Sequence, residues 1–196
     1  GTLTSARSVA GASNPRDRNR KAFASPVRPR SDAEALGLVI GQGSLEATPL
    51  QVAVMMAAIA NGGLRVIPHV HHDAFQPPLP IEGIELSRDA AIRDIQKALE
   101  QVVLDRRGTG HEHVYLPDIA IAGKTGTAQS GSPLGDHAWF AGYAPAKQPR
   151  VAVVVALEHA GSGALGAGPL ARDLIRRMGE LGYFSEAEPA ALAETW

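Results

Sequence analysis

The last third of the sequence constrains the fold most strongly, because it contains three short apolar segments joined by connections of turn length. The segments are IAIAGKT, HAWFAGYAP and RVAVVVALE, and each has the length of a strand. AQSGSPLGD and APAKQP connect them and contain the residue types of hairpin loops. Connections this short join neighbouring strands, so we expect a three-stranded antiparallel sheet. An amphipathic segment, GPLARDLIRRMGELGYF, follows and predicts a helix packed across that sheet.

A capped, strongly apolar helix is predicted before the sheet. Thr48 suits the N-cap, Pro49 the first helical position, and Gln51 completes a capping box. The body, VAVMMAAIA, is apolar on all sides, which predicts a helix buried on most of its surface. Asn61, Gly62 and Gly63 tolerate positive φ and end it.

A second helix is predicted to begin at Ser87, with the sequence SRDAAIRDIQKALEQVVL. Its apolar residues follow a helical stripe. They are Ile92, Ile95, Leu99, Val102 and Val103. Asp105 and Arg107 are interpreted as an ion-paired helix end. Helices together with an antiparallel sheet place the chain in the α+β class.

The ends of the chain differ from this core. Residues 1–35 are rich in arginine, proline and serine and lack an apolar period, which predicts a linker or a poorly ordered basic segment. A docking site for an acidic partner is the alternative for this segment. Residues 36–184 are expected to form the folded part, and residues 185–196 a loosely held tail.

Composition excludes several classes of site. The 196 residues contain no cysteine, which excludes disulfides, thiolate catalysis and a thiolate zinc site. The net charge of -1 gives no electrostatic support for binding nucleic acid. No apolar run approaches the length of a membrane span, and the first residues do not form a signal peptide.

A polar motif, KTGT, lies at the end of the first predicted strand and comprises residues 124–127. Lys124 carries a positive charge, and Thr125 and Thr127 carry hydroxyl groups. Gly126 lets a ligand approach the backbone closely, and the Thr127 N–H is suited to stabilising an oxyanion. The motif is interpreted as a strand edge that binds an anion, and a solvated strand end is the alternative.

Several short motifs occur in one order along the chain: GQG-x4-TPLQ, ANGG, GTG, AGKTGTAQ and HAWFAGYAPA. This series resembles the C-terminal part of the transpeptidase domain of the class B penicillin-binding proteins, in which K-T-G is one of three active-site motifs. The resemblance implies the α+β fold of penicillin-binding proteins and serine β-lactamases, with helices flanking an antiparallel sheet.

The resemblance also implies a role for each residue of KTGT. Lys124 and Thr127 are implied to be catalytic, Lys124 by its charge near the nucleophile and Thr127 by its N–H in the oxyanion hole. Thr125, Gly126 and Thr127 are implied to bind the substrate, with the two hydroxyls on the terminal carboxylate of a D-Ala-D-Ala stem peptide or of a β-lactam. The resemblance implies no cofactor and no metal.

Two other motifs of that family are not found in the 196 residues. No serine is followed by lysine three positions later, and none is followed by asparagine two positions later, so S-x-x-K and S-x-N are absent. Acyl transfer needs a nucleophile and its base in contact, so the chain alone is expected to be inactive. The resemblance implies that an N-terminal part of the same enzyme, bearing S-x-x-K, completes the domain.

The expected reaction is cross-linking of peptidoglycan by a serine D,D-transpeptidase. The implied partners are that S-x-x-K part, the stem peptide, β-lactams and a membrane glycosyltransferase of the elongation or division machinery. The implied location is extracytoplasmic, with an N-terminal membrane anchor that this sequence lacks. Two alternatives stay open: a non-catalytic relic that binds stem peptide, and a fragment of a D,D-carboxypeptidase or β-lactamase.

Histidines form two weaker candidate sites. On a strand, His69, His71 and Asp73 would share one face, with His72 beside them, which suits zinc or nickel. A surface loop with several histidines is the other interpretation. His137 is expected on a strand near the edge of the cleft, where a direct role in the site is the alternative to a structural one.

Overall fold

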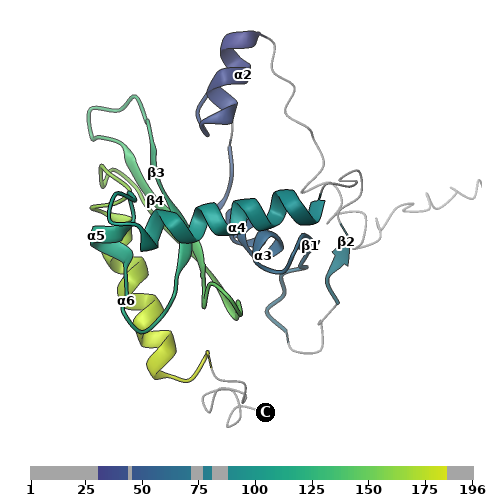
Figure 1. Cartoon of the computed structure of the whole chain (residues 1–196). Coiled ribbons are helices and arrows are strands. Elements are labelled where there is room, and N and C mark those ends of the chain that lie inside the picture. The colour runs from purple at the N-terminus through teal and green to yellow at the C-terminus, as the bar shows by residue number, and fades with distance from the viewer. Residues whose placement is uncertain (1–30, 44–45, 72–76, 81–87, 185–196) are drawn as a thin grey trace, which may run out of the picture. The chain divides into compact units, whose positions relative to one another are not determined.

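The computed structural model describes residues 31–43, 46–71, 77–80 and 88–184, and the chain divides into two compact units, residues 1–45 and 46–196 (Figure 1). We describe each unit by itself. Most of the predicted linker and the whole predicted tail lie outside the described residues.

The first unit contains one described helix, α2 (Asp32–Val39). Its N-cap is Ser31, whose hydroxyl accepts a hydrogen bond from the Glu34 N–H at 3.2 Å. This helix was not predicted, and it crosses the boundary expected between residues 35 and 36. The following turn has φ of 74° at Gly41 and 81° at Gly43, a left-handed conformation that glycine adopts without strain.

The second unit is built on the predicted antiparallel sheet, with strands β3 (Ala122–Ala128), β4 (His137–Ala144) and β5 (Val151–Leu157) in the order β3-β4-β5. In the register, Thr125 lies opposite Phe140, and Phe140 lies opposite Val155. The three-stranded prediction is confirmed. Among the described strands, β3 lies at an edge of the sheet, with only β4 beside it.

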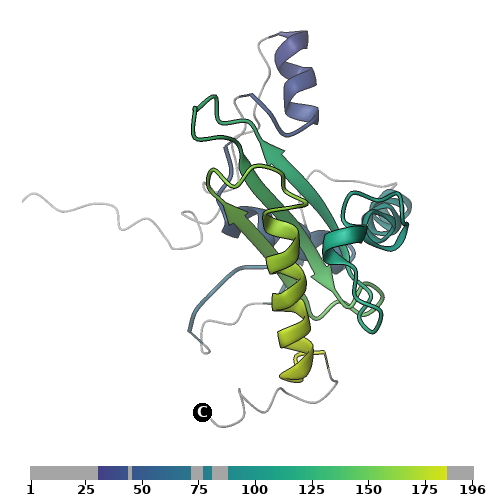
Figure 2. The same ribbon diagram turned by 90° about the vertical axis from the view of Figure 1, so that its left-hand side faces the viewer.

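Helices pack on both faces of this sheet. The helix α6 (Ala167–Glu180) packs on one face, where Phe140 and Ile175 belong to one hydrophobic core (Figure 2). The helices α3 (Pro49–Ala60) and α4 (Arg88–Leu104) contact the sheet through a second core. Met56 and Tyr143 are buried in that second core. Since Phe140 and Tyr143 are three residues apart on β4, their side chains point to opposite faces of the sheet, and each is buried in one of the two cores.

The capping box predicted for α3 is confirmed. The Thr48 hydroxyl accepts from the Gln51 N–H at 3.2 Å, and the Gln51 side chain accepts from the Thr48 N–H at 2.8 Å. The predicted burial of its body is confirmed on most sides, because Met55, which is 52% exposed, is the only exposed residue of 52–60. The helix contacts β1, β4, β5 and α4.

Further elements complete the second unit. The helix α5 (His111–Val114) contacts α6 and the end of α4. After α3, the short strand β1 (Leu64–Arg65) pairs with β2 (Leu79–Pro80). Within the described residues, no helix is both long and apolar enough to span a membrane.

Candidate active site

The KTGT motif lies in the middle of β3, and the alternation of side chains along the strand divides it between the two faces of the sheet. Thr125 lies opposite Phe140 and therefore on the α6 face, together with Thr127. Lys124 and Gly126 share the other face with Ala122, which belongs to the core under α3. The strand therefore presents two hydroxyls on one side and one positive charge on the other.

The Lys124 side chain is exposed at the edge of the sheet. Its ammonium group donates a hydrogen bond of 2.7 Å to the carbonyl oxygen of Thr125. This contact holds the charge against the backbone of the motif itself. An ammonium group in this position can attract an anion that binds along the strand.

Thr125 is buried, with 8% of its surface exposed. Its Oγ1 lies 2.9 Å from Oγ1 of Thr109, in the turn between α4 and α5. Either hydroxyl can be the donor of this hydrogen bond. Thr125, which is expected to bind a carboxylate, is thus hydrogen-bonded to the hydroxyl of Thr109, a residue outside the motif.

Thr127 is tied to the loop between β5 and α6. Its Oγ1 accepts a hydrogen bond of 3.1 Å from the Gly163 N–H. A Cβ atom at position 163 would lie 2.1 Å from the Gly126 carbonyl oxygen and 2.6 Å from that of Trp139. Only glycine therefore permits this close packing of the loop on β3.

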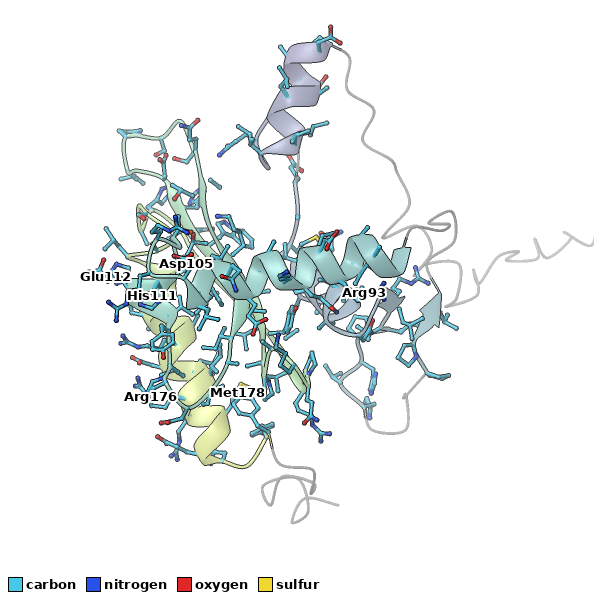
Figure 3. All side chains as sticks on the ribbon, in the orientation of Figure 1. Arg93, Asp105, His111, Glu112, Arg176 and Met178 are labelled. Atoms are coloured by element: carbon cyan, nitrogen blue, oxygen red, sulfur yellow. The ribbon has the colours of Figure 1, made fainter. Side chains whose placement is uncertain are left out.

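The turn that carries Thr109 is held by an ion pair, as predicted. The Arg107 guanidinium donates to Asp105 through Nε at 3.2 Å and through Nη2 at 2.9 Å. The Arg107 side chain, followed by its backbone N–H, lowers the pKa of Asp105 from 3.8 to about 2. Asp105 and His111 flank this turn, at the end of α4 and the start of α5 (Figure 3).

His137 is the first residue of β4 and pairs with Ala128, so its prediction as a strand residue is confirmed. Its Nδ1 accepts a hydrogen bond of 3.1 Å from the backbone N–H of His159. The two imidazole rings lie 4.7 Å apart. His159 has a φ of 53° and its Nδ1 is 3.0 Å from the Gly135 carbonyl oxygen. These contacts join the β3–β4 and β5–α6 loops and give His137 a structural role.

The histidine-rich segment does not form a metal site in the described part of the chain, where no group of three or more candidate ligands converges. The strand assumed for His69 and His71 is absent, because β1 ends at Arg65. His72 and Asp73 lie outside the described residues.

Two residues at this site, Thr109 and Gly163, were not predicted from the sequence. The GTG tripeptide at 108–110 was noted only as one of a series of motifs, although a threonine between two glycines at a helix end is the signal that points to it. No local pattern marks Gly163, since its importance depends on how the loop packs against β3.

The chain as a whole matches proteins of one kind. The family model of the penicillin binding protein transpeptidase domain matches residues 18–176. The peptidoglycan D,D-transpeptidase MrdA of Haemophilus influenzae is 34% identical over an alignment of 169 positions, and the match covers 76% of this chain and 26% of that protein. This chain thus spans about a quarter of the length of that relative.

Solved structures of the same kind share the fold. The penicillin-binding protein PBP2 of Helicobacter pylori, in its complex with MreC, matches with a TM-score of 0.69 and 31% identity, over 78% of this chain and 28% of that one. The imipenem acyl-enzyme complex of penicillin-binding protein A from M. tuberculosis matches with a TM-score of 0.58 and 29% identity, over 76% of this chain and 35% of that one.

Proposed function

The chain belongs to the penicillin-binding protein transpeptidase family, in its class B branch, and we propose that its strand β3, with the KTGT motif, forms one side of a peptidoglycan D,D-transpeptidase active site. The observation that carries the proposal is the arrangement of β3, where the hydroxyls of Thr125 and Thr127 share one face of an edge strand and the exposed Lys124 directly precedes them in sequence.

The proposed ligand is the terminal carboxylate of a D-Ala-D-Ala stem peptide, or the equivalent carboxylate of a β-lactam. Thr125 and Thr127 donate hydrogen bonds to it, and hydrogen bonds to a charged acceptor are stronger than those between neutral groups. Gly126 lets the peptide lie against the strand because no side chain separates them. The charge of Lys124 lies near the nucleophile and stabilises negative charge there.

In the proposed reaction a serine hydroxyl attacks the carbonyl carbon of the D-Ala-D-Ala amide bond. The Thr127 N–H stabilises the oxyanion that forms, and the terminal D-Ala leaves as an amine when the amide bond breaks. The acyl-enzyme then reacts with an amine of a second stem peptide, which forms the cross-link and restores the serine.

The nucleophile of this reaction is proposed to come from a segment that carries S-x-x-K, since no serine here has that spacing. Apolar side chains are exposed on α3 and α6, which supports the proposal that such a segment packs against these helices. They include Leu50, Met55, Leu170 and Leu174. We place the complete enzyme outside the cytoplasmic membrane, where its substrate lies, beside a membrane glycosyltransferase that supplies the glycan.

The test is acylation of the full-length protein that carries this chain by a fluorescent penicillin. Lys124→Ala is expected to lower the acylation rate at least about tenfold, because it removes a charge directed at the site. The matched control is Lys147→Ala, since Lys147 is also an exposed lysine but pairs with Glu100 at 2.6 Å. Equal rates in wild type, Lys124→Ala and Lys147→Ala would refute the assignment.

A further inference from the structure

We propose that Thr109 is a positioning residue for the carboxylate site, and that its hydroxyl fixes the direction in which Thr125 donates its hydrogen. The inference rests on the proposed function, because it assigns Thr125 the carboxylate that the function requires. Its basis is the 2.9 Å contact between the two Oγ1 atoms, which joins residues 16 positions apart in the sequence.

The two threonines differ in burial. Thr125 is buried, whereas Thr109 is exposed and can hydrogen-bond to water without any partner in the protein. The bond therefore matters mainly for Thr125. It gives the buried hydroxyl a partner and fixes its rotation about the Cβ–Oγ1 bond.

The turn around Thr109 is built to hold the side chain in place. The Gly108 N–H donates to the Asp105 carbonyl at 2.7 Å, and the Gly110 N–H donates to the Val102 carbonyl at 3.0 Å. A Cβ atom on Gly108 would lie 2.2 Å from that same Val102 oxygen, so the turn packs closely on the last turn of α4. The ion pair between Asp105 and Arg107 is a further contact within this turn.

A hydroxyl group has one hydrogen to donate and two lone pairs that accept. When Thr109 donates to Thr125, one lone pair of the Thr125 oxygen is occupied and its hydrogen is directed elsewhere. A carboxylate in the proposed site is the acceptor for that hydrogen. Thr109 thus acts on the ligand through Thr125, and its effect depends on the negative charge of the ligand.

The experiment uses the full-length protein and two penicillins, one with its free carboxylate and one as the methyl ester. Thr109→Val keeps the shape of the side chain but removes the hydroxyl. We expect it to raise the concentration for half-maximal acylation by the carboxylate form about three- to tenfold, with the limiting rate changed by less than about twofold. Acylation by the ester is expected to stay at the wild-type level for this variant.

Two further variants separate positioning from folding. Thr109→Ser restores the hydroxyl and is expected to return the carboxylate form to within about twofold of wild type. Arg106→Ala changes an exposed residue of the same turn and is expected to have no effect. Thermal unfolding midpoints that match wild type establish that the variants are folded.

The outcomes are distinct. A loss in Thr109→Val that is equal for both penicillins, a failure of Thr109→Ser to rescue, or no change in Thr109→Val would each overturn the role of Thr109. In all three cases the proposed function stands if Lys124→Ala and Thr125→Val still impair acylation in the same assay. Unchanged acylation in those two variants would refute the proposed function and this inference with it.

Discussion

At the scale of single residues, each polar group of KTGT is held by a contact from outside its own position. Lys124 is held by the Thr125 carbonyl, Thr125 by Thr109, and Thr127 by the Gly163 N–H. The motif could be assigned from the sequence because it occurs in a series of motifs that resembles the transpeptidase family, whereas its own four residues left a solvated strand end open. Thr109 and Gly163 could not be assigned in the same way, since their roles come from tertiary contacts that no periodic pattern encodes.

A pH prediction belongs to this scale and concerns Asp105. Its folded pKa is about 2 against an ordinary 3.8, because Arg107 stabilises the carboxylate. Because its pKa is lower in the folded state, the ionised Asp105 carboxylate contributes to stability above pH 3.8, and this contribution is lost as the pH falls through about 2. We expect the carboxyl carbon of Asp105 to titrate in NMR with a midpoint near 2, and Arg107→Ala to raise that midpoint toward 3.8. A wild-type midpoint already at 3.8 would contradict the ion pair.

At the scale of elements, the three strands of the larger sheet and the helices α3, α4 and α6 could be predicted from the sequence. The capping box of α3 and the hairpin-length connections of the sheet are local signals, and the described residues bear them out. Two helices were not predicted from the sequence. The helix α2 follows a basic, proline-rich segment that obscured its Ser31 cap, and α5 has only four residues, too few for an apolar period to show.

The packing of the β5–α6 loop on β3 gives a prediction for Gly163→Ala. The added methyl would lie 2.1 Å from the Gly126 oxygen, so the loop must move away and release the Thr127 hydroxyl. We expect the free energy of unfolding to fall by about 2 kcal/mol, measured by urea denaturation, and acylation by penicillin to fall with it. The exposed neighbour Ser162 provides the control, since Ser162→Ala should change neither quantity. Full stability and activity in Gly163→Ala would show that this loop does not support the motif.

At the scale of the whole molecule, the described second unit has exposed residues on the edge strand of its sheet and on parts of two helix faces. In β3 that edge carries the KTGT motif, and on α3 and α6 the exposed residues are large and apolar. Surfaces of this kind are typical of places where further polypeptide packs. This chain covers 26% of the length of one family relative and 36% of another. Both observations support the proposal that the nucleophile lies in polypeptide outside these 196 residues.

The measurement that tests this account most directly is the intact mass of the protein before and after incubation with a labelled penicillin. For this measurement the chain and the polypeptide that carries S-x-x-K are produced separately and combined, so that each has its own mass. We predict that the S-x-x-K polypeptide gains the mass of one penicillin, that this chain gains none, and that Lys124→Ala in this chain slows the gain. A penicillin adduct on this chain itself, or no adduct on either polypeptide, would contradict the division of the active site proposed here.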